Sequence, residues 1–77
     1  MVQAYILVQT EVGMADQVAE AVSALEGAVR VDIVTGPYDV VVLTEAASAD
    51  HLRALVVSRV QRVAGITRTL TCSILNA

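Results

Sequence analysis

Four stretches of the chain are rich in the hydrophobic residues that form β-strands, and they are of two kinds. Residues 3–10 and 39–44 each contain a continuous apolar run, Tyr5–Val8 and Val40–Leu43, that is apolar on both faces, which is typical of strands covered on both sides. In residues 29–35 and 66–75, apolar positions alternate with polar ones, as in strands with one buried face. The pattern therefore predicts four strands, with residues 39–44 as a central one.

Two further stretches have the spacing of helices. Hydrophobic residues recur every three or four positions in residues 14–26 and again in about 49–64. Gly27 and Gly65 follow the last apolar positions, where a left-handed glycine commonly ends a helix. Ser48 offers an N-cap side chain to the second helix. The residues expected on the inward face of that helix are Leu52, Leu55, Val56, Val60 and Val63.

The order of these elements predicts a fold. The chain reads strand, helix, strand, strand, helix, strand, and the segment Gly36-Pro37-Tyr38 indicates a tight hairpin between the second and third strands. Right-handed crossovers place both helices on one face of a four-stranded antiparallel sheet. We therefore expect a single α+β domain over residues 1–77 with the ferredoxin-like βαββαβ fold.

One face of this sheet has no cover. Two helices shield only one face, whereas residues 3–10 and 39–44 are apolar on both. The composition agrees, because 56% of the 77 residues are hydrophobic and a monomer of this size buries only about 60% of the surface of its unfolded chain. We therefore expect the second face to pack against another copy of the chain, giving a homodimer of the dimeric α/β-barrel type.

Charge and cysteine content narrow the classes of function. The net charge is −3, with five arginines and no lysine, which argues against direct nucleic-acid binding. No apolar stretch reaches the length of about 18 residues that spans a membrane, and the first residues lack the basic region of a signal peptide. We therefore expect a cytoplasmic protein. The single cysteine allows no internal disulfide, and no cluster has metal-ligand spacing, so neither a metal nor a cofactor is expected.

Individual side chains give little indication of catalysis. His51 lies near a helix start on the polar face, where a lone histidine is usually solvated. Asp39 lies beside a turn, and we interpret it as a carboxylate that accepts hydrogen bonds from nearby backbone N–H groups or contacts a ligand. No nucleophile, base and oxyanion donor come together at sensible spacing, so no catalytic residue is assigned.

The last strand carries two further features. Cys72 lies on the apolar side of the alternation, so we expect a buried, unreactive thiol. The opposite side is a row of hydroxyls, which either reflects the β-propensity of threonine or binds a small polar ligand. This row consists of Thr67, Thr69, Thr71 and Ser73.

Two motifs resemble those of a known family. Residues 35–39 read Thr-Gly-Pro-Tyr-Asp and are followed by four apolar residues, and residues 63–71 read Val-Ala-Gly-Ile-Thr-Arg-Thr-Leu-Thr. Together they resemble the effector-binding module of the leucine-responsive/asparagine-specific (Lrp/AsnC, or feast/famine) transcriptional regulators. The resemblance extends over nearly the whole chain, with the motifs in the same order and spacing.

The resemblance implies an oligomeric, small-molecule-binding module linked to transcriptional regulation. Such modules have the βαββαβ fold, dimerise through their sheets and commonly join into octamers or similar rings. Their effectors, usually amino acids, bind at interfaces between dimers. The turn after the second strand lines that site, so the candidate ligand contacts are Gly36, Tyr38 and Asp39. The last strand also contributes, which adds Thr67, Thr69 and Thr71.

We expect the protein to lack the N-terminal helix-turn-helix domain of these regulators, so the resemblance does not imply DNA binding. It resembles the stand-alone form of the module, which we expect to influence transcription by assembling with a DNA-binding relative. The sequence leaves two alternatives open. One is a small enzyme of the dimeric α/β-barrel type that uses His51 or Asp39 as acid or base. The other is a purely structural assembly partner of a full-length regulator.

Overall fold

The computed structural model describes residues 1–76 except for the side chain of Leu55, so the inward position predicted for Leu55 lies outside the described part. The strands are β1 (Val2–Thr10), β2 (Ala28–Ile33), β3 (Val40–Ala46) and β4 (Ile66–Ser73). The helical elements are α1 (Ala15–Ser23), α2 (Ala49–His51), η1 (Leu52–Val57) and α3 (Ser58–Gln61). The elements α2, η1 and α3 follow one another without a break, so the chain has the predicted order.

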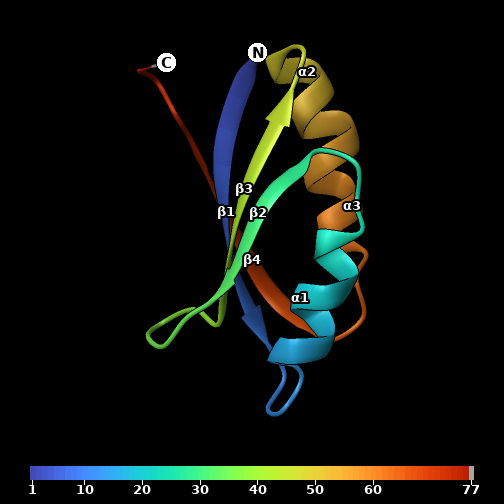
Figure 1. Ribbon diagram of the computed structural model, residues 1–77, viewed down its shortest axis with the longest axis vertical. Helices are drawn as coiled ribbons and strands as arrows, with labels where there is room; N and C mark the ends of the chain where they lie inside the picture. The colour runs from blue at the N-terminus through green and yellow to red at the C-terminus, as the bar shows by residue number, and fades with distance from the viewer. Residues whose placement is uncertain (77) are drawn as a thin grey trace.

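The four strands form one antiparallel sheet in the order β2-β3-β1-β4. The two strands that are apolar on both faces, β1 and β3, lie in the middle, and the two alternating strands form the edges. Both helical segments pack on the same face of the sheet (Figure 1), as right-handed crossovers require. The predicted ferredoxin-like fold is therefore confirmed.

The core between the sheet and the helices is aliphatic. On β1, the side chains of Ala4, Ile6 and Val8 face the helices and are completely buried. Thr44 is the buried polar residue among the described ones, and its Oγ1 donates a hydrogen bond to the Ala4 carbonyl at 2.8 Å, which compensates for the loss of water. The other buried hydrophobic residues are Val18, Ala19, Val22, Val40, Val42, Ala46, Leu52, Val56 and Val60.

Both helices end three residues earlier than the hydrophobic spacing predicts. Their last turns are tightened, because the Leu25 N–H bonds to the Val22 carbonyl at 3.0 Å and the Val63 N–H to the Val60 carbonyl at 3.1 Å. The second helix also differs in its middle, where Leu52–Val57 forms a π turn. No helix of the described chain is long and apolar enough to cross a membrane.

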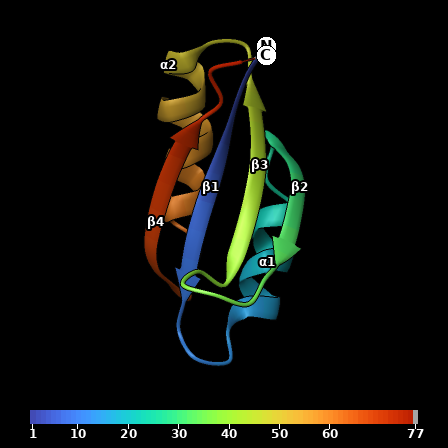
Figure 2. The same cartoon turned by 90° about the vertical axis from the view of Figure 1, so that its left-hand side faces the viewer.

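The opposite face of the sheet, which we call the open face, is turned toward the viewer in Figure 2. Leu7 lies at its centre, directly between Val41 on β3 and Leu70 on β4. Tyr5 and Leu70 are 43% and 44% exposed, so this single chain leaves large hydrophobic side chains in contact with solvent. The hydrophobic residues of the open face are Tyr5, Leu7, Val41, Leu43, Leu70 and Cys72.

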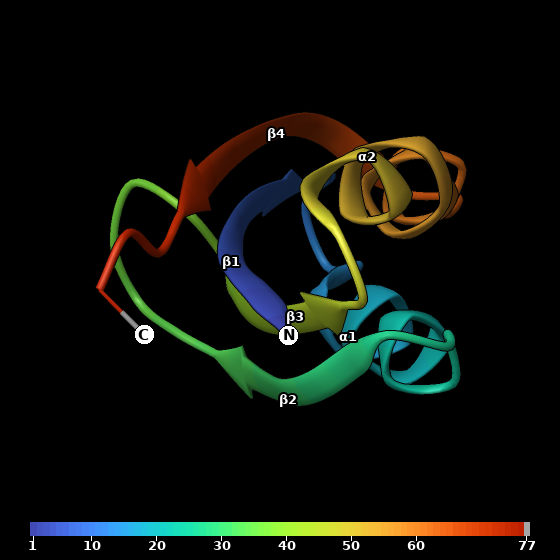
Figure 3. The same cartoon turned by 90° about the horizontal axis from the view of Figure 1, so that it is seen from above.

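Two segments of backbone project on the side of the open face. The β2–β3 connection, residues 34–39, bends away from the helices and passes over one end of the open face (Figures 1 and 2). Residues 74–76 leave β4 on the same side, as the view from above shows (Figure 3). The open face is therefore a hydrophobic surface framed by two projecting segments.

Candidate ligand-binding site

Asp39 fixes the turn of the first motif to β1. Its Oδ2 accepts hydrogen bonds from the Thr10 backbone N–H at 2.8 Å and from Thr10 Oγ1 at 3.3 Å. Two backbone bonds of 2.9 Å add to these, one from the Asp39 N–H to the Val8 carbonyl and one from the Val34 N–H to the Asp39 carbonyl. The carboxylate therefore bonds to a residue 29 positions away, not to the neighbouring N–H groups that the sequence suggested.

Anchored in this way, the turn presents Gly36 and Tyr38 near the surface. Its tip is held by a hydrogen bond of 2.9 Å from Gln9 Nε2 to the Pro37 carbonyl. Gly36 is exposed, and a Cβ atom placed on it would meet nothing within 4 Å, so a ligand can approach the backbone closely. Tyr38 is half-buried. Asp39 Oδ1 makes no hydrogen bond to a described residue, which leaves one carboxylate oxygen as an acceptor for an ammonium group.

The hydroxyl row of β4 faces the helices. The register places Thr69 opposite Val8 and Thr71 opposite Ile6, and directly opposed residues in an antiparallel pair point to the same face. Since Val8 and Ile6 are in the core, the two threonines point toward the helical layer. Thr69 Oγ1 accepts a hydrogen bond from Gln61 Nε2 at 3.3 Å.

Thr71 also lines a cleft of about 410 Å³ between β4 and the second helix. Ser73 and Arg53 lie in the same lining, with Leu52 and Val57 supplying apolar wall. The Arg53 guanidinium is only loosely paired, with Nη2 at 3.7 Å from Asp50 Oδ1. Hydroxyls beside a guanidinium can bind a carboxylate.

The structure does not bring the two groups of predicted contacts together within one chain. β1 separates the turn on β3 from the threonines on β4. The turn bends toward the open face, whereas Thr69 and Thr71 lie on the covered one. Thr67 is exposed, next to the position where the pairing of β4 with β1 shifts register. A single site that uses both groups therefore takes the turn from one chain and the hydroxyls from another.

The prediction that Cys72 is a buried thiol is wrong for the single chain, because Cys72 is exposed. It lies opposite Tyr5 on the open face. The alternation along β4 is the predicted one, but its apolar side points away from the helices. The same cause explains why the hydroxyl row is on the covered face.

His51 and Asp39 lie at opposite ends of β3. Asp39 precedes the strand and His51 follows it, and the seven residues from Val40 to Ala46 correspond to about 20 Å of extended chain. His51 is exposed, and its backbone N–H donates to the predicted N-cap, Ser48 Oγ, at 3.1 Å. The pair therefore cannot act together as acid and base in one chain. Among the described residues, no three His, Cys, Asp or Glu side chains are placed to hold a metal ion.

Sequence reasoning missed the partners of the turn, Gln9 and Thr10. Both are polar residues at the end of a mostly apolar strand. That change from apolar to polar residues could have indicated that the end of the strand contacts another segment. It also missed the clefts lined by Arg53 and Arg59, because the hydrophobic spacing leaves both residues outside the inward face predicted for the second helix. The periodicity of a helix shows which of its faces is buried, but it does not show where the helix lies over the sheet and therefore where a cleft forms.

Comparison with known proteins agrees with this fold. The family model described as Lrp/AsnC ligand binding domain matches residues 3–77. No curated protein matches the chain. The solved structure of TTHA0845 from Thermus thermophilus is 28% identical with a TM-score of 0.91, covering 100% of this chain and 96% of that one. The structure of FFRP-DM1 is 27% identical with a TM-score of 0.90, covering 97% and 100%.

A longer regulator shares the fold. The feast or famine regulatory protein from Mycobacterium tuberculosis, solved in complex with L-methionine, is 23% identical with a TM-score of 0.83. The match covers 100% of this chain and 52% of the regulator, so the chain corresponds to about half of that protein. Because the family model matches all but the first two residues, the chain belongs to the Lrp/AsnC family, as its ligand binding domain.

Proposed function

We propose that the chain is a non-catalytic, oligomeric module that binds a small effector of the amino-acid class. The observation that carries this proposal is the turn of residues 35–39, which Asp39 holds rigidly against β1 while Gly36 remains open to a ligand. The family to which the chain belongs supports it. Further support comes from the Mycobacterium tuberculosis regulator of the same fold, whose structure contains L-methionine.

The open face is the proposed dimer interface. It exposes Tyr5 and Leu70 in a single chain, and a soluble protein rarely leaves such a hydrophobic patch uncovered. Packing two open faces together covers this surface in both copies and makes a two-fold dimer. Such dimers then join into an octamer or a similar ring.

The ligand contacts proposed on the turn are Gly36, Tyr38 and Asp39. Asp39 Oδ1 accepts a hydrogen bond from the ammonium group, and the backbone near Gly36 meets the carboxylate. Thr67, Thr69 and Thr71 reach the ligand from a neighbouring chain, since no single chain joins the two groups. We further propose that the effector signal reaches DNA through assembly with a DNA-binding relative.

The test is isothermal titration of the full chain with each common L-amino acid, together with native mass spectrometry of the oligomer. At least one amino acid is expected to bind and to change the distribution of oligomers. Asp39→Asn removes the charge but keeps the side-chain shape, and it should weaken binding about tenfold or more, because a hydrogen bond to a charged group contributes about 1.5–3 kcal/mol. Asp50→Asn is the matched control, because Asp50 is 99% exposed on α2.

Three results would overturn parts of this proposal. If no amino acid binds, the effector role is wrong and the purely structural alternative gains support. If Asp39→Asn and Asp50→Asn bind equally well, the turn is not the site. A strict monomer at micromolar concentration would exclude both the dimer and any site shared between chains. The enzyme alternative already lacks its acid–base pair within one chain, given the separation of His51 and Asp39.

A further inference from the structure

A second cleft lies at the end of the sheet remote from the 35–39 turn. It is bounded by the α1–β2 connection, the end of β3 and the second helix, and it has a volume of about 580 Å³. Ligand pockets in proteins commonly measure about 300–1,000 Å³, so a small molecule fits. Neither the family motifs nor the hydroxyl row of β4 contributes a residue to its lining.

The hollow exists because small residues meet there. The Gly27 carbonyl accepts a hydrogen bond from the Glu45 N–H at 2.9 Å, which joins the connection to β3. A Cβ atom on Gly27 would lie 2.6 Å from Val56 Cγ2, so only glycine allows the two segments to approach this closely. Val56 and Ala46 are 4% and 6% exposed and form an apolar floor. Val56 belongs to the π turn, a feature frequently found at functional sites.

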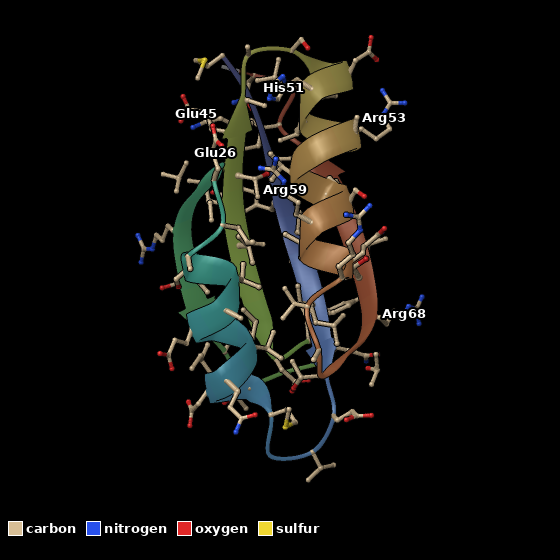
Figure 4. The ribbon with its side chains drawn as sticks, turned by 90° about the vertical axis from the view of Figure 1, so that its right-hand side faces the viewer. Glu26, Glu45, His51, Arg53, Arg59 and Arg68 are labelled. Carbon is tan, nitrogen blue, oxygen red and sulfur yellow. The ribbon has the colours of Figure 1, made fainter. Side chains whose placement is uncertain are left out.

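Charged side chains of both signs surround this floor. Around the same opening lie Glu26, Glu45, His51 and Arg59, which come from three different segments: the α1–β2 connection, β3 and the second helix (Figure 4). Arg53 and Arg68 extend away from it in the same view. Arg59 Nη1 lies 3.8 Å from Glu26 Oε2, which is too long for a hydrogen bond. Because these side chains are 41% and 90% exposed, the pair contributes little to stability and is free to accept other partners.

This arrangement selects a ligand by its charges. A molecule with only a carboxylate is drawn to Arg59 but repelled by Glu26 and Glu45. A molecule with only an amine is attracted to these acidic residues but repelled by Arg59. A dipolar molecule gains at both ends if its carboxylate lies toward Arg59 and its ammonium toward Glu26. The imidazole of His51 can donate a further hydrogen bond to the carboxylate. The floor of Val56 and Ala46 suits an aliphatic body.

We infer that this cleft binds a small zwitterion with an aliphatic side chain, at a site separate from the 35–39 turn. The inference goes beyond the proposed function, because it does not use the turn, the hydroxyl row or the open face. The two sites lie at opposite ends of β3, so each can be disabled while the other is measured. A chain with both sites binds two molecules of the same class, one at the turn and one in this cleft.

The experiment is a ¹⁵N–¹H correlation spectrum of the full chain, recorded with each common L-amino acid as the probe. At least one is expected to shift the amide signals of Gly27, Glu45 and Val56. For valine, the one-charge analogues 3-methylbutanoate and 2-methylpropylamine should bind about tenfold more weakly or not at all, since each loses one charge-assisted contact. Arg59→Gln should have an effect of similar size on the Gly27 signals. Arg62→Gln, which removes the same charge from an exposed position that lines neither cleft, should have none.

The outcomes separate this site from the turn. Shifts at the cleft that persist in Asp39→Asn and disappear in Arg59→Gln support the inference, even if the turn binds nothing. Shifts confined to residues 35–39 overturn the inference and leave the proposed function intact. Equal binding of valine and 3-methylbutanoate shows a simple anion site and overturns the zwitterion assignment. If no amino acid moves the cleft signals, the cleft is not a site for this class.

Discussion

The Asp39 carboxylate accepts a hydrogen bond from the Thr10 backbone N–H at 2.8 Å and thereby joins the β2–β3 turn to the end of β1. The bond crosses between two central strands, and Thr10 Oγ1 reinforces it at 3.3 Å. Asp39 is therefore as much a part of the scaffold as a candidate ligand contact. A substitution that removes the acceptor oxygen changes the geometry of the turn as well as its charge, so the choice of substitution decides what is learned.

Asp39→Ala is expected to destabilise the fold by about 1–3 kcal/mol, because it leaves the half-buried Thr10 N–H without a partner. Asp39→Asn keeps an acceptor oxygen at the same place and should cost less. Urea unfolding of both variants, followed by circular dichroism, gives the comparison. Glu20→Ala removes an exposed carboxylate from α1 and serves as the control. Equal midpoints for Asp39→Ala and the control would contradict a structural role for the carboxylate.

Leu7→Glu tests the open face. Leu7 lies between Val41 and Leu70 at its centre, and the substitution places a charge in the middle of the proposed interface. A buried charge without a partner costs about 3–5 kcal/mol, so the dimer should dissociate at least about a hundredfold more readily. Sedimentation equilibrium over a range of concentrations measures this change.

Val12→Glu is the matched control, because Val12 is fully exposed in the β1–α1 connection and introduces the same charge. It should leave the oligomer unchanged. The Leu7 variant is expected to remain folded, because its side chain points away from the core between sheet and helices. If Leu7→Glu assembles as well as Val12→Glu, the open face is not the interface.

The fold was predictable because the hydrophobic pattern of the sequence restricts the order of the strands and the placement of the helices. Strands that are apolar on both faces have to be central, and two right-handed crossovers leave one arrangement of the helices. The face of an edge strand was harder to predict. Alternation shows that Thr69 and Thr71 share a face, but it does not show whether helices cover that face, since both sides of β4 are partly exposed.

The candidate site was predictable only in part, for a related reason. The 35–39 motif identifies the turn, whereas the bond between Asp39 and Thr10 depends on the pairing register of β1 with β3. A continuous apolar run leaves such a register undetermined, because every shift buries similar side chains. The second cleft depends on how closely Gly27 approaches Val56, which is a property of tertiary packing.

Cys72 provides a chemical probe of the same interface. In the single chain its thiol is exposed on the open face, opposite Tyr5, and a dimer formed through that face buries it. The reaction with an aromatic disulfide reagent should therefore be slow in the wild-type protein and fast in Leu7→Glu, because only an accessible thiolate is attacked. Addition of urea below the unfolding midpoint should accelerate the wild-type reaction by separating the chains. Equally fast labelling of both proteins would show that the open face is free in solution.

Gly27→Ala tests the close contact that closes the core beneath the second cleft. Gly27 has φ +96°, and a Cβ atom there would lie 2.6 Å from Val56 Cγ2. Alanine therefore destabilises the fold in two ways. Holding it in the left-handed backbone conformation costs about 1–2 kcal/mol, and the overpacking costs about 1–3 kcal/mol. Gly13→Ala is the control, because Gly13 has φ +80° with nothing within 4 Å of its Cβ, and it should show the backbone cost alone. The difference between the two free energies of unfolding, measured in urea, isolates the contact with Val56. Equal losses in both variants would mean that the α1–β2 connection moves aside, and that the cleft can open by the same movement.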